Sequence, residues 1–146
     1  FQDDYASEFA RINYAWIEKY FTIEDIDRDY LDHPKSKIIN TGGAILFAKL
    51  DDLIIGTAAL VQRDSGVFEL SKMGVDEGYQ GFQIGKQLGR TIIQTAKSMG
   101  ARRIYLESNR RLIPALNLYR KLGFREVSRA GKSDYGRSDI VMEMYV

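Results

Sequence analysis

The sequence predicts an α/β (α+β) fold with one mixed, mostly antiparallel sheet of about six strands flanked by helices, in the order ααβββαβαββ. Two observations support this class. β-rich runs of strand length are separated by turn residues, and between them lie segments whose apolar residues recur at helical spacing. With 146 residues and a hydrophobic content of 45%, the chain can bury one core but is too short for two ordinary domains. We therefore predict a single domain over residues 1–146.

Two helices are predicted before the first strand. Thr22 and Asp25 suggest a cap that opens the second, short helix. This helix ends near Asp32, before Pro34, and the only histidine, His33, lies at its end in a surface or capping role. The apolar stripe of the first helix has helical spacing, and its aromatic members are expected in the core: Tyr5, Phe9, Ile12, Trp16 and Tyr20.

The remaining elements follow from β-rich runs and two amphipathic segments. One helix is predicted from Ile84 to Met99 and another from Arg111 to Phe124, where Gly123 provides the C-terminal stop. The first two strands form an antiparallel hairpin, and a polar loop joins the last two. The predicted strands are residues 43–50, 53–63, 67–75, 103–108, 124–128 and 139–146.

The composition excludes several classes of site. The chain has no cysteine, which excludes disulfides, thiolate metal ligands and a cysteine nucleophile. With one histidine a histidine-rich metal site is impossible, so no metal is expected. The longest nearly apolar run, residues 53–61, is about half a membrane span, and the first residues contain no apolar signal core. A cytoplasmic protein with no membrane partner is therefore expected.

The net charge of +1 conceals an uneven distribution. Residues 1–77 contain 8 basic and 15 acidic residues, whereas residues 78–132 contain 12 basic and 2 acidic residues. The basic half could steer a ligand that carries phosphates. A basic nucleic-acid-binding domain is an alternative, but no recognised nucleic-acid motif accompanies these residues, so this partner is not favoured.

The most informative segment is GYQGFQIGKQLGR, residues 78–90, which places a glycine-rich turn directly before an amphipathic helix. The first N–H groups of a helix lack intrahelical partners and lie at the positive end of its dipole, so this segment predicts a phosphate site. A Walker A loop is excluded, because only three residues separate Gly81 from Gly85 and glutamine follows Lys86. The dinucleotide fingerprint G-x-G-x-x-G is absent as well.

Two motifs resemble the GNAT family of N-acetyltransferases. The family's pyrophosphate loop, R/Q-x-x-G-x-G/A, is matched at Gln80 and Gly85, while its central glycine is replaced by Gln83. In the second motif, N-x-x-A-x-x-L-Y-x-x-x-G-F, the asparagine position is Leu112, and Asn109 lies one helical turn earlier. The other positions are in register: Ala115, Leu118, Tyr119, Gly123 and Phe124.

The resemblance implies acetyl-CoA as co-substrate. Its pantetheine arm would lie along the strand that precedes the loop, and a backbone N–H near Val75 would polarise the acetyl carbonyl. The residues implied to bind acetyl-CoA are Met73, Gly74, Val75, Gln80, Gly81, Phe82, Gln83, Ile84, Gly85, Lys86, Asn109 and Tyr119.

The resemblance also implies the transfer of an acetyl group to a primary amine by direct attack in a ternary complex. Glu69 is the implied base, because it lies six residues before Val75, as a glutamate does in histone-modifying members of the family. On an unbroken strand Glu69, Met73 and Val75 would share one face, whereas a bulge between them would alter this. A solvent-facing strand carboxylate is the alternative interpretation of Glu69. Tyr119 is the implied acid, with a purely core aromatic as its alternative.

The acceptor stays open among a small molecule, an amino acid and a protein amine. It is expected to bind against the first two helices and the loop near Tyr135, and the acidic first half would suit a cationic amine. A non-catalytic acyl-CoA sensor, which Gln83 favours, is a function of another class. Homodimers are common in the family, whose members usually begin with a further strand that the sequence does not contain before its first helix.

Overall fold

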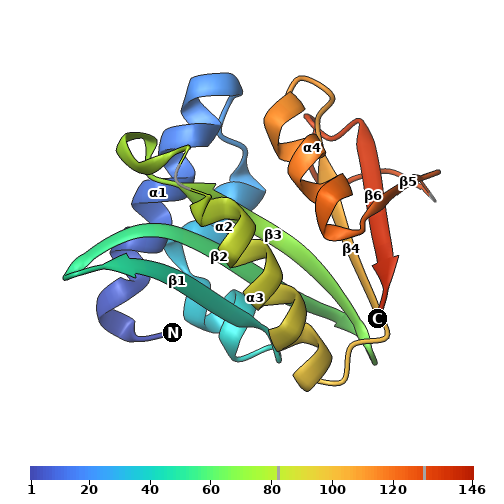
Figure 1. Ribbon diagram of the computed structural model, residues 1–146, viewed down its shortest axis with the longest axis horizontal. Helices are drawn as coiled ribbons and strands as arrows, with labels where there is room; N and C mark the ends of the chain where they lie inside the picture. Colours follow the sequence, from blue (N-terminus) through green and yellow to red (C-terminus); the bar gives the residue numbers. More distant parts are fainter. Residues whose placement is uncertain (82, 130) are drawn as a thin grey trace.

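Six strands form one mixed sheet in the order β1-β2-β3-β4-β6-β5 (Figure 1). The structure is a computed structural model that describes residues 1–81, 83–129 and 131–146. Neighbouring strands are antiparallel except β3 and β4, which are parallel. The strands are β1 Ala44–Leu50, β2 Leu53–Asp64, β3 Val67–Val75, β4 Arg103–Ser108, β5 Arg125–Val127 and β6 Ile140–Tyr145. This arrangement confirms the predicted fold class.

The main helices cover both faces of the sheet: α1 Ala6–Tyr20, α2 Asp25–Asp32, α3 Ile84–Ser98 and α4 Ile113–Leu122. Alternating side chains of β2 face two cores, so that Leu60 packs with α3 and Val61 packs with α1 and α2. Short helical turns at Asp3–Tyr5, Lys35–Ile39 and Glu77–Tyr79 were not predicted. In the described part of the chain no helix has both the length and the hydrophobicity needed to cross a bilayer.

The start of α2 differs from the prediction. Its cap is Glu24 rather than Thr22, and the carboxylate of Asp27 accepts the Glu24 N–H at 2.9 Å. The two acidic side chains cap each other's backbone N–H groups in a capping box. His33 does end this helix as predicted, at an exposed position.

A β-bulge interrupts β3 at Lys72, whose φ of 50° lies in the left-handed region. Thr57 of β2 pairs with Gly74 and Ala59 pairs with Ser71, so two residues of β3 lie opposite one residue of β2. Each strand residue reverses the direction of the next side chain, and the extra residue therefore changes which face the rest of β3 presents.

The shared face of Glu69, Met73 and Val75 was expected only for an unbroken strand, and this bulge separates Glu69 from the other two. Glu69 pairs with Val61, which belongs to the core beneath α1 and α2. Met73 instead packs in the core beneath α3, and Val75 points toward Gly85 at the start of that helix. Counting residues along the strand could not show whether a bulge is present, and in the structure the bulged residue Lys72 pairs with Asp27, which is distant in the chain.

The parallel strands β3 and β4 part after a short contact. They pair at Val67 with Arg103, Phe68 with Ile104, and Glu69 with Tyr105, and β4 continues in register with β6 alone. Figure 1 shows the two strands diverging from this point. The carboxyl ends of diverging parallel strands are a common place for a ligand, since backbone and side chains from both sides can reach it.

Candidate active site

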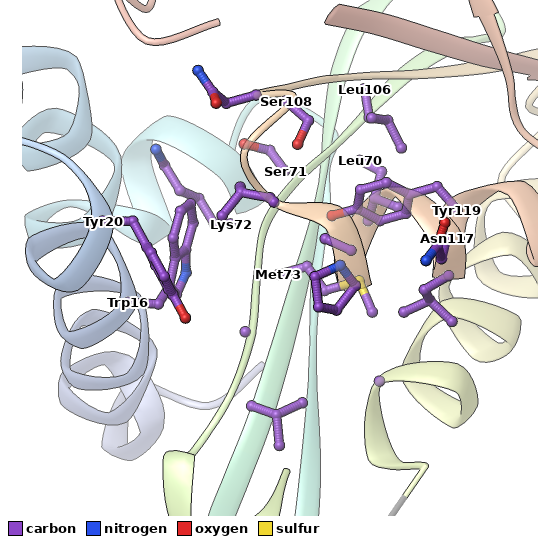
Figure 2. Close-up of a pocket in the computed structure, with 18 of the residues that line it drawn as sticks. Trp16, Tyr20, Leu70, Ser71, Lys72, Met73, Leu106, Ser108, Asn117 and Tyr119 are labelled. Atoms are coloured by element: carbon purple, nitrogen blue, oxygen red, sulfur yellow. The ribbon is translucent and has the colours of Figure 1, made fainter. Parts of the chain in front are cut away.

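A cleft of about 780 Å³ lies where β3 and β4 diverge (Figure 2). Its walls come from the end of α1, β3, the loop before α3, the end of β4 and α4. Phe82, a predicted ligand residue, lies outside the described residues. The cleft brings the other predicted site residues together: Glu69, Met73, Gly74, Val75, Gln80, Gly81, Gln83, Ile84, Gly85, Lys86, Asn109 and Tyr119.

One end of the cleft is built by the loop before α3. Gln83 caps this helix with φ 61° and ψ 20°, the left-handed conformation that normally favours glycine. Gly81 also has a positive φ of 90°, and a Cβ added there would have no neighbour within 4 Å. The backbone of this loop therefore still adopts the conformation that glycine favours, although Gln83 replaces the central glycine of the family motif. Gln80 ties it to the end of β3 by donating to the Val75 carbonyl at 3.1 Å.

Tyr119 lies on the opposite wall, on α4. Figure 2 shows its hydroxyl directed from α4 toward the middle of the cleft. Its ring packs edge-on against Phe124, with 6.1 Å between the ring centroids. The ring of Tyr119 therefore belongs to the core, while its hydroxyl faces the cleft. Burial raises the pKa of Tyr119 to about 12, which keeps the phenol protonated at neutral pH.

Glu69 is buried, with 2% of its surface exposed, rather than facing solvent. Arg63 donates two hydrogen bonds to it, from Nε at 2.9 Å and from Nη2 at 2.5 Å, and both end on Oε1. Oε2 has no hydrogen-bond donor among the described residues. Burial raises the pKa of Glu69, while the charge of Arg63 opposes that shift. The raised pKa makes this carboxylate a stronger base than an exposed glutamate.

A family model described as the Acetyltransferase (GNAT) family matches residues 9–124. The chain belongs to the GNAT acetyltransferase family. It is 34% identical over 97 residues to an uncharacterized N-acetyltransferase of Mycobacterium bovis, a match that covers 66% of this chain and 58% of that relative. The chain therefore spans little more than half the length of this curated relative.

Solved GNAT structures share the architecture. A GNAT-family acetyltransferase from Staphylococcus aureus Mu50 superposes with a TM-score of 0.88 at 27% identity, covering 99% of this chain and 95% of that one. A Bacillus subtilis acetyltransferase in complex with CoA superposes with a TM-score of 0.74 at 21% identity, covering 100% of this chain and 94% of that one. The second likeness supports the GNAT fold alone.

In this GNAT chain an aromatic wall, Trp16, Tyr20 and Phe21, faces α4 across the cleft. Figure 2 shows Trp16 and Tyr20 on the side of α1, opposite Tyr119. A Cβ on Gly74 would lie 2.8 Å from Trp16 Cδ1, so a glycine in β3 allows this close approach. The prediction that the aromatic residues of α1 belong to the core is wrong for Tyr20, which is 42% exposed. Helical spacing alone could not distinguish a core stripe from a cleft wall.

A buried charge cluster, formed by Asp27, Lys72 and Arg137, supports this side of the cleft. Lys72 Nζ donates to Asp27 Oδ1 at 2.6 Å, and Arg137 donates to Oδ1 at 2.6 Å and to Oδ2 at 2.7 Å. Burial by itself would raise the pKa of Asp27, but the bonds from Arg137 and the charge of Lys72 outweigh it and lower the pKa to about 2. Burial lowers the pKa of Lys72. No sequence motif marks this cluster.

Asn109 lines the cleft but is occupied by the backbone around it. Its Nδ2 donates to the Arg137 carbonyl at 2.7 Å, and its Oδ1 accepts the Arg111 N–H at 2.8 Å. The side chain thus fixes the turn before α4, and its contact with CoA stays a prediction. Further cleft residues that the sequence did not single out as ligands include Ser71, Lys72, Ser108, Arg111, Asn117 and Arg137.

Proposed function

We propose that this protein is an N-acetyltransferase that moves the acetyl group of acetyl-CoA to a primary amine by direct attack in a ternary complex. One observation carries the proposal: the loop before α3, Glu69 of β3 and Tyr119 of α4 all line a single cleft. The family and the CoA held by the Bacillus subtilis structure support the identity of the donor.

The residues of the cleft suit the parts of CoA. β3 pairs with β4 only as far as Glu69, so among the described residues the following part of β3 has no strand partner on that edge. Pantetheine amides can pair with this edge at Met73, Gly74 and Val75. The first turn of α3, from Ile84 to Lys86, offers N–H groups and a positive dipole end to the pyrophosphate.

The thioester supplies an activated acetyl carbon. Glu69 Oε2 removes a proton from the acceptor amine, directly or through one water molecule, as the amine nitrogen bonds to that carbon. The Val75 N–H stabilises the negative charge on the carbonyl oxygen. When the carbon–sulfur bond breaks, Tyr119 donates a hydrogen bond to the thiolate. Its pKa of about 12 exceeds that of a thiol, near 8.5, so Tyr119 acts mainly as a donor and keeps its proton.

Thermal unfolding with acetyl-CoA tests the proposal. At one hundred times its dissociation constant, acetyl-CoA is expected to stabilise the protein by about 2.7 kcal/mol and to raise Tm by roughly 5 to 10 °C. ATP and NAD serve as controls. A rise that is shared by all three ligands, or absent with acetyl-CoA, would contradict the assignment of the donor. A specific rise without acetylation of any amine in a broad panel would indicate the sensor function instead.

Replacing Gln83 with glycine is expected to tighten acetyl-CoA binding about threefold or more. Glycine adopts the φ of 61° without steric strain and lets the pyrophosphate approach bare backbone. Isothermal titration of both proteins with acetyl-CoA measures the difference. Weaker binding by Gln83→Gly would show instead that the glutamine amide contributes to holding the ligand.

A further inference from the structure

We propose that the acceptor carries a carboxylate beside its amine, as an amino acid does, and that Arg111 binds this carboxylate. The inference rests on the proposed acetyltransferase function and names the substrate class of the same cleft. It starts from the charged side chains near the aromatic wall of the cleft, where the Arg111 guanidinium lies over the Phe21 ring.

Most charged side chains around this part of the cleft are already neutralised. Glu69 is paired with Arg63, and Glu107 with Arg129. Lys72 and Arg137 share the carboxylate of Asp27, and Arg137 also reaches Glu24 at 3.2 Å. The guanidinium of Arg111 has no ion-pair partner among residues 1–81, 83–129 and 131–146. It therefore remains as a positive charge that an anionic group of a ligand can neutralise.

Arg111 is also oriented for such a contact. Its guanidinium lies over the Phe21 ring, 5.4 Å from the centroid, and Nη1 donates to the Tyr20 carbonyl at 3.3 Å. The backbone N–H of Arg111 donates to Asn109 Oδ1, and this hydrogen bond fixes the turn. A guanidinium has five N–H donors, and a planar fork of two of them fits a carboxylate. The remaining donors can serve this purpose while the aromatic ring limits the rotamers of the side chain.

The same wall is poorly suited to a polycationic acceptor. Aromatic faces can bind cations, but here the protein's own cations already lie over them. Lys72 and Arg137 lie over the Tyr135 ring at 4.4 and 4.7 Å, and Arg137 lies 5.9 Å from the Trp16 ring. A second positive charge would meet Arg111 and Arg137. The geometry therefore favours an acceptor whose amine is accompanied by a negative group over the purely cationic amine suggested by the acidic first half of the sequence.

The test compares L-amino acids with their carboxamides, which keep the amine and side chain but remove the negative charge. The wild-type protein is expected to acetylate its best amino acid with a kcat/KM at least about tenfold above that of the matching carboxamide, since a hydrogen-bonded ion pair is lost. Arg111→Gln is expected to remove this preference by lowering kcat/KM for the amino acid about tenfold and changing the carboxamide less than twofold.

Arg110→Gln is the matched control. Arg110 neighbours Arg111 and is also exposed, but its side chain pairs with Glu126 outside the cleft. It should leave the preference for the amino acid within twofold of wild type. The acetyl-CoA-induced rise in Tm, measured for both variants, verifies that the donor site is intact.

The outcomes separate the two claims. Equal use of amino acid and carboxamide by the wild type, or an unchanged preference in Arg111→Gln, overturns the carboxylate assignment and leaves the acetyltransferase proposal standing. An absence of acetylated product from every amine overturns the proposed function, and the carboxylate assignment with it. Loss of the preference in Arg110→Gln as well would show a general charge effect and would also overturn the role of Arg111.

Discussion

Tyr119→Phe is expected to lower kcat at least tenfold while leaving the affinity for acetyl-CoA within about threefold. The substitution removes only the hydroxyl that Figure 2 shows facing the cleft, and the ring keeps its packing against Phe124. A hydrogen bond to the leaving sulfur forms only as negative charge develops there, so its loss raises the barrier rather than weakening binding. Steady-state kinetics and titration with acetyl-CoA measure the two quantities separately.

Tyr145→Phe provides a control for the loss of a tyrosine hydroxyl. Tyr145 lies at the end of β6, is largely exposed and does not line the cleft. Its variant should retain the wild-type kcat within twofold. An unchanged kcat in Tyr119→Phe would remove the phenol from the mechanism. A kcat that falls together with the affinity for acetyl-CoA would assign Tyr119 to binding of the donor instead.

Asp27→Asn is expected to have the largest effect on stability. The change leaves Lys72 and Arg137 without their shared carboxylate in a buried site, and an uncompensated buried charge typically costs about 3 to 5 kcal/mol. The expected fall in Tm is about 10 °C. Asp29→Asn, an exposed neighbour on α2, should change the free energy of unfolding by less than about 0.5 kcal/mol.

A second variant and the pH dependence keep this prediction testable. Combining Asp27→Asn with Lys72→Met should recover at least about 1 kcal/mol, because one unpaired buried cation is removed. The folded-state pKa of about 2 lies below the unfolded value, so the stability from ionised Asp27 is present above about pH 4 and is lost as the pH falls toward 2. The difference in the free energy of unfolding between wild type and Asp27→Asn should therefore become smaller as the pH falls over this range. A difference that does not change with pH would show that the destabilisation of Asp27→Asn is not caused by the loss of the negative charge.

Local patterns in the sequence were sufficient for the order of elements. The hairpin of β1 and β2, the helices α3 and α4, and the stop at Gly123 follow from strand-length apolar runs, helical spacing and a C-terminal glycine. The helical turn at Lys35–Ile39 carries no such local signal. The cap of α2 was misplaced because Glu24 and Asp27 perform a task that serine or threonine more often performs.

The sequence brought out candidate site residues where they lie in contiguous motifs. The structure places the described ones, Gln80, Gly81, residues 83–86 and Tyr119, along one cleft. The sequence left a bulge in this strand open but could not place it at Lys72, which has a left-handed φ and pairs with Asp27, 45 residues earlier in the chain. For the same reason the face occupied by Glu69 and the position of Arg111 could be known only from the tertiary structure.

The charge cluster around Asp27 also bears on the order in which the cleft can form. Strand β3 and helix α3 are consecutive in the chain, so the contacts between them, on the proposed acetyl-CoA side, are local in sequence and can form early. The charge cluster on the proposed acceptor side forms only when Asp27 meets Lys72, 45 residues later, and Arg137, 110 residues later. During synthesis the cluster that supports the proposed acceptor side can thus be completed only after residue 137 has left the ribosome, well after β3 and α3.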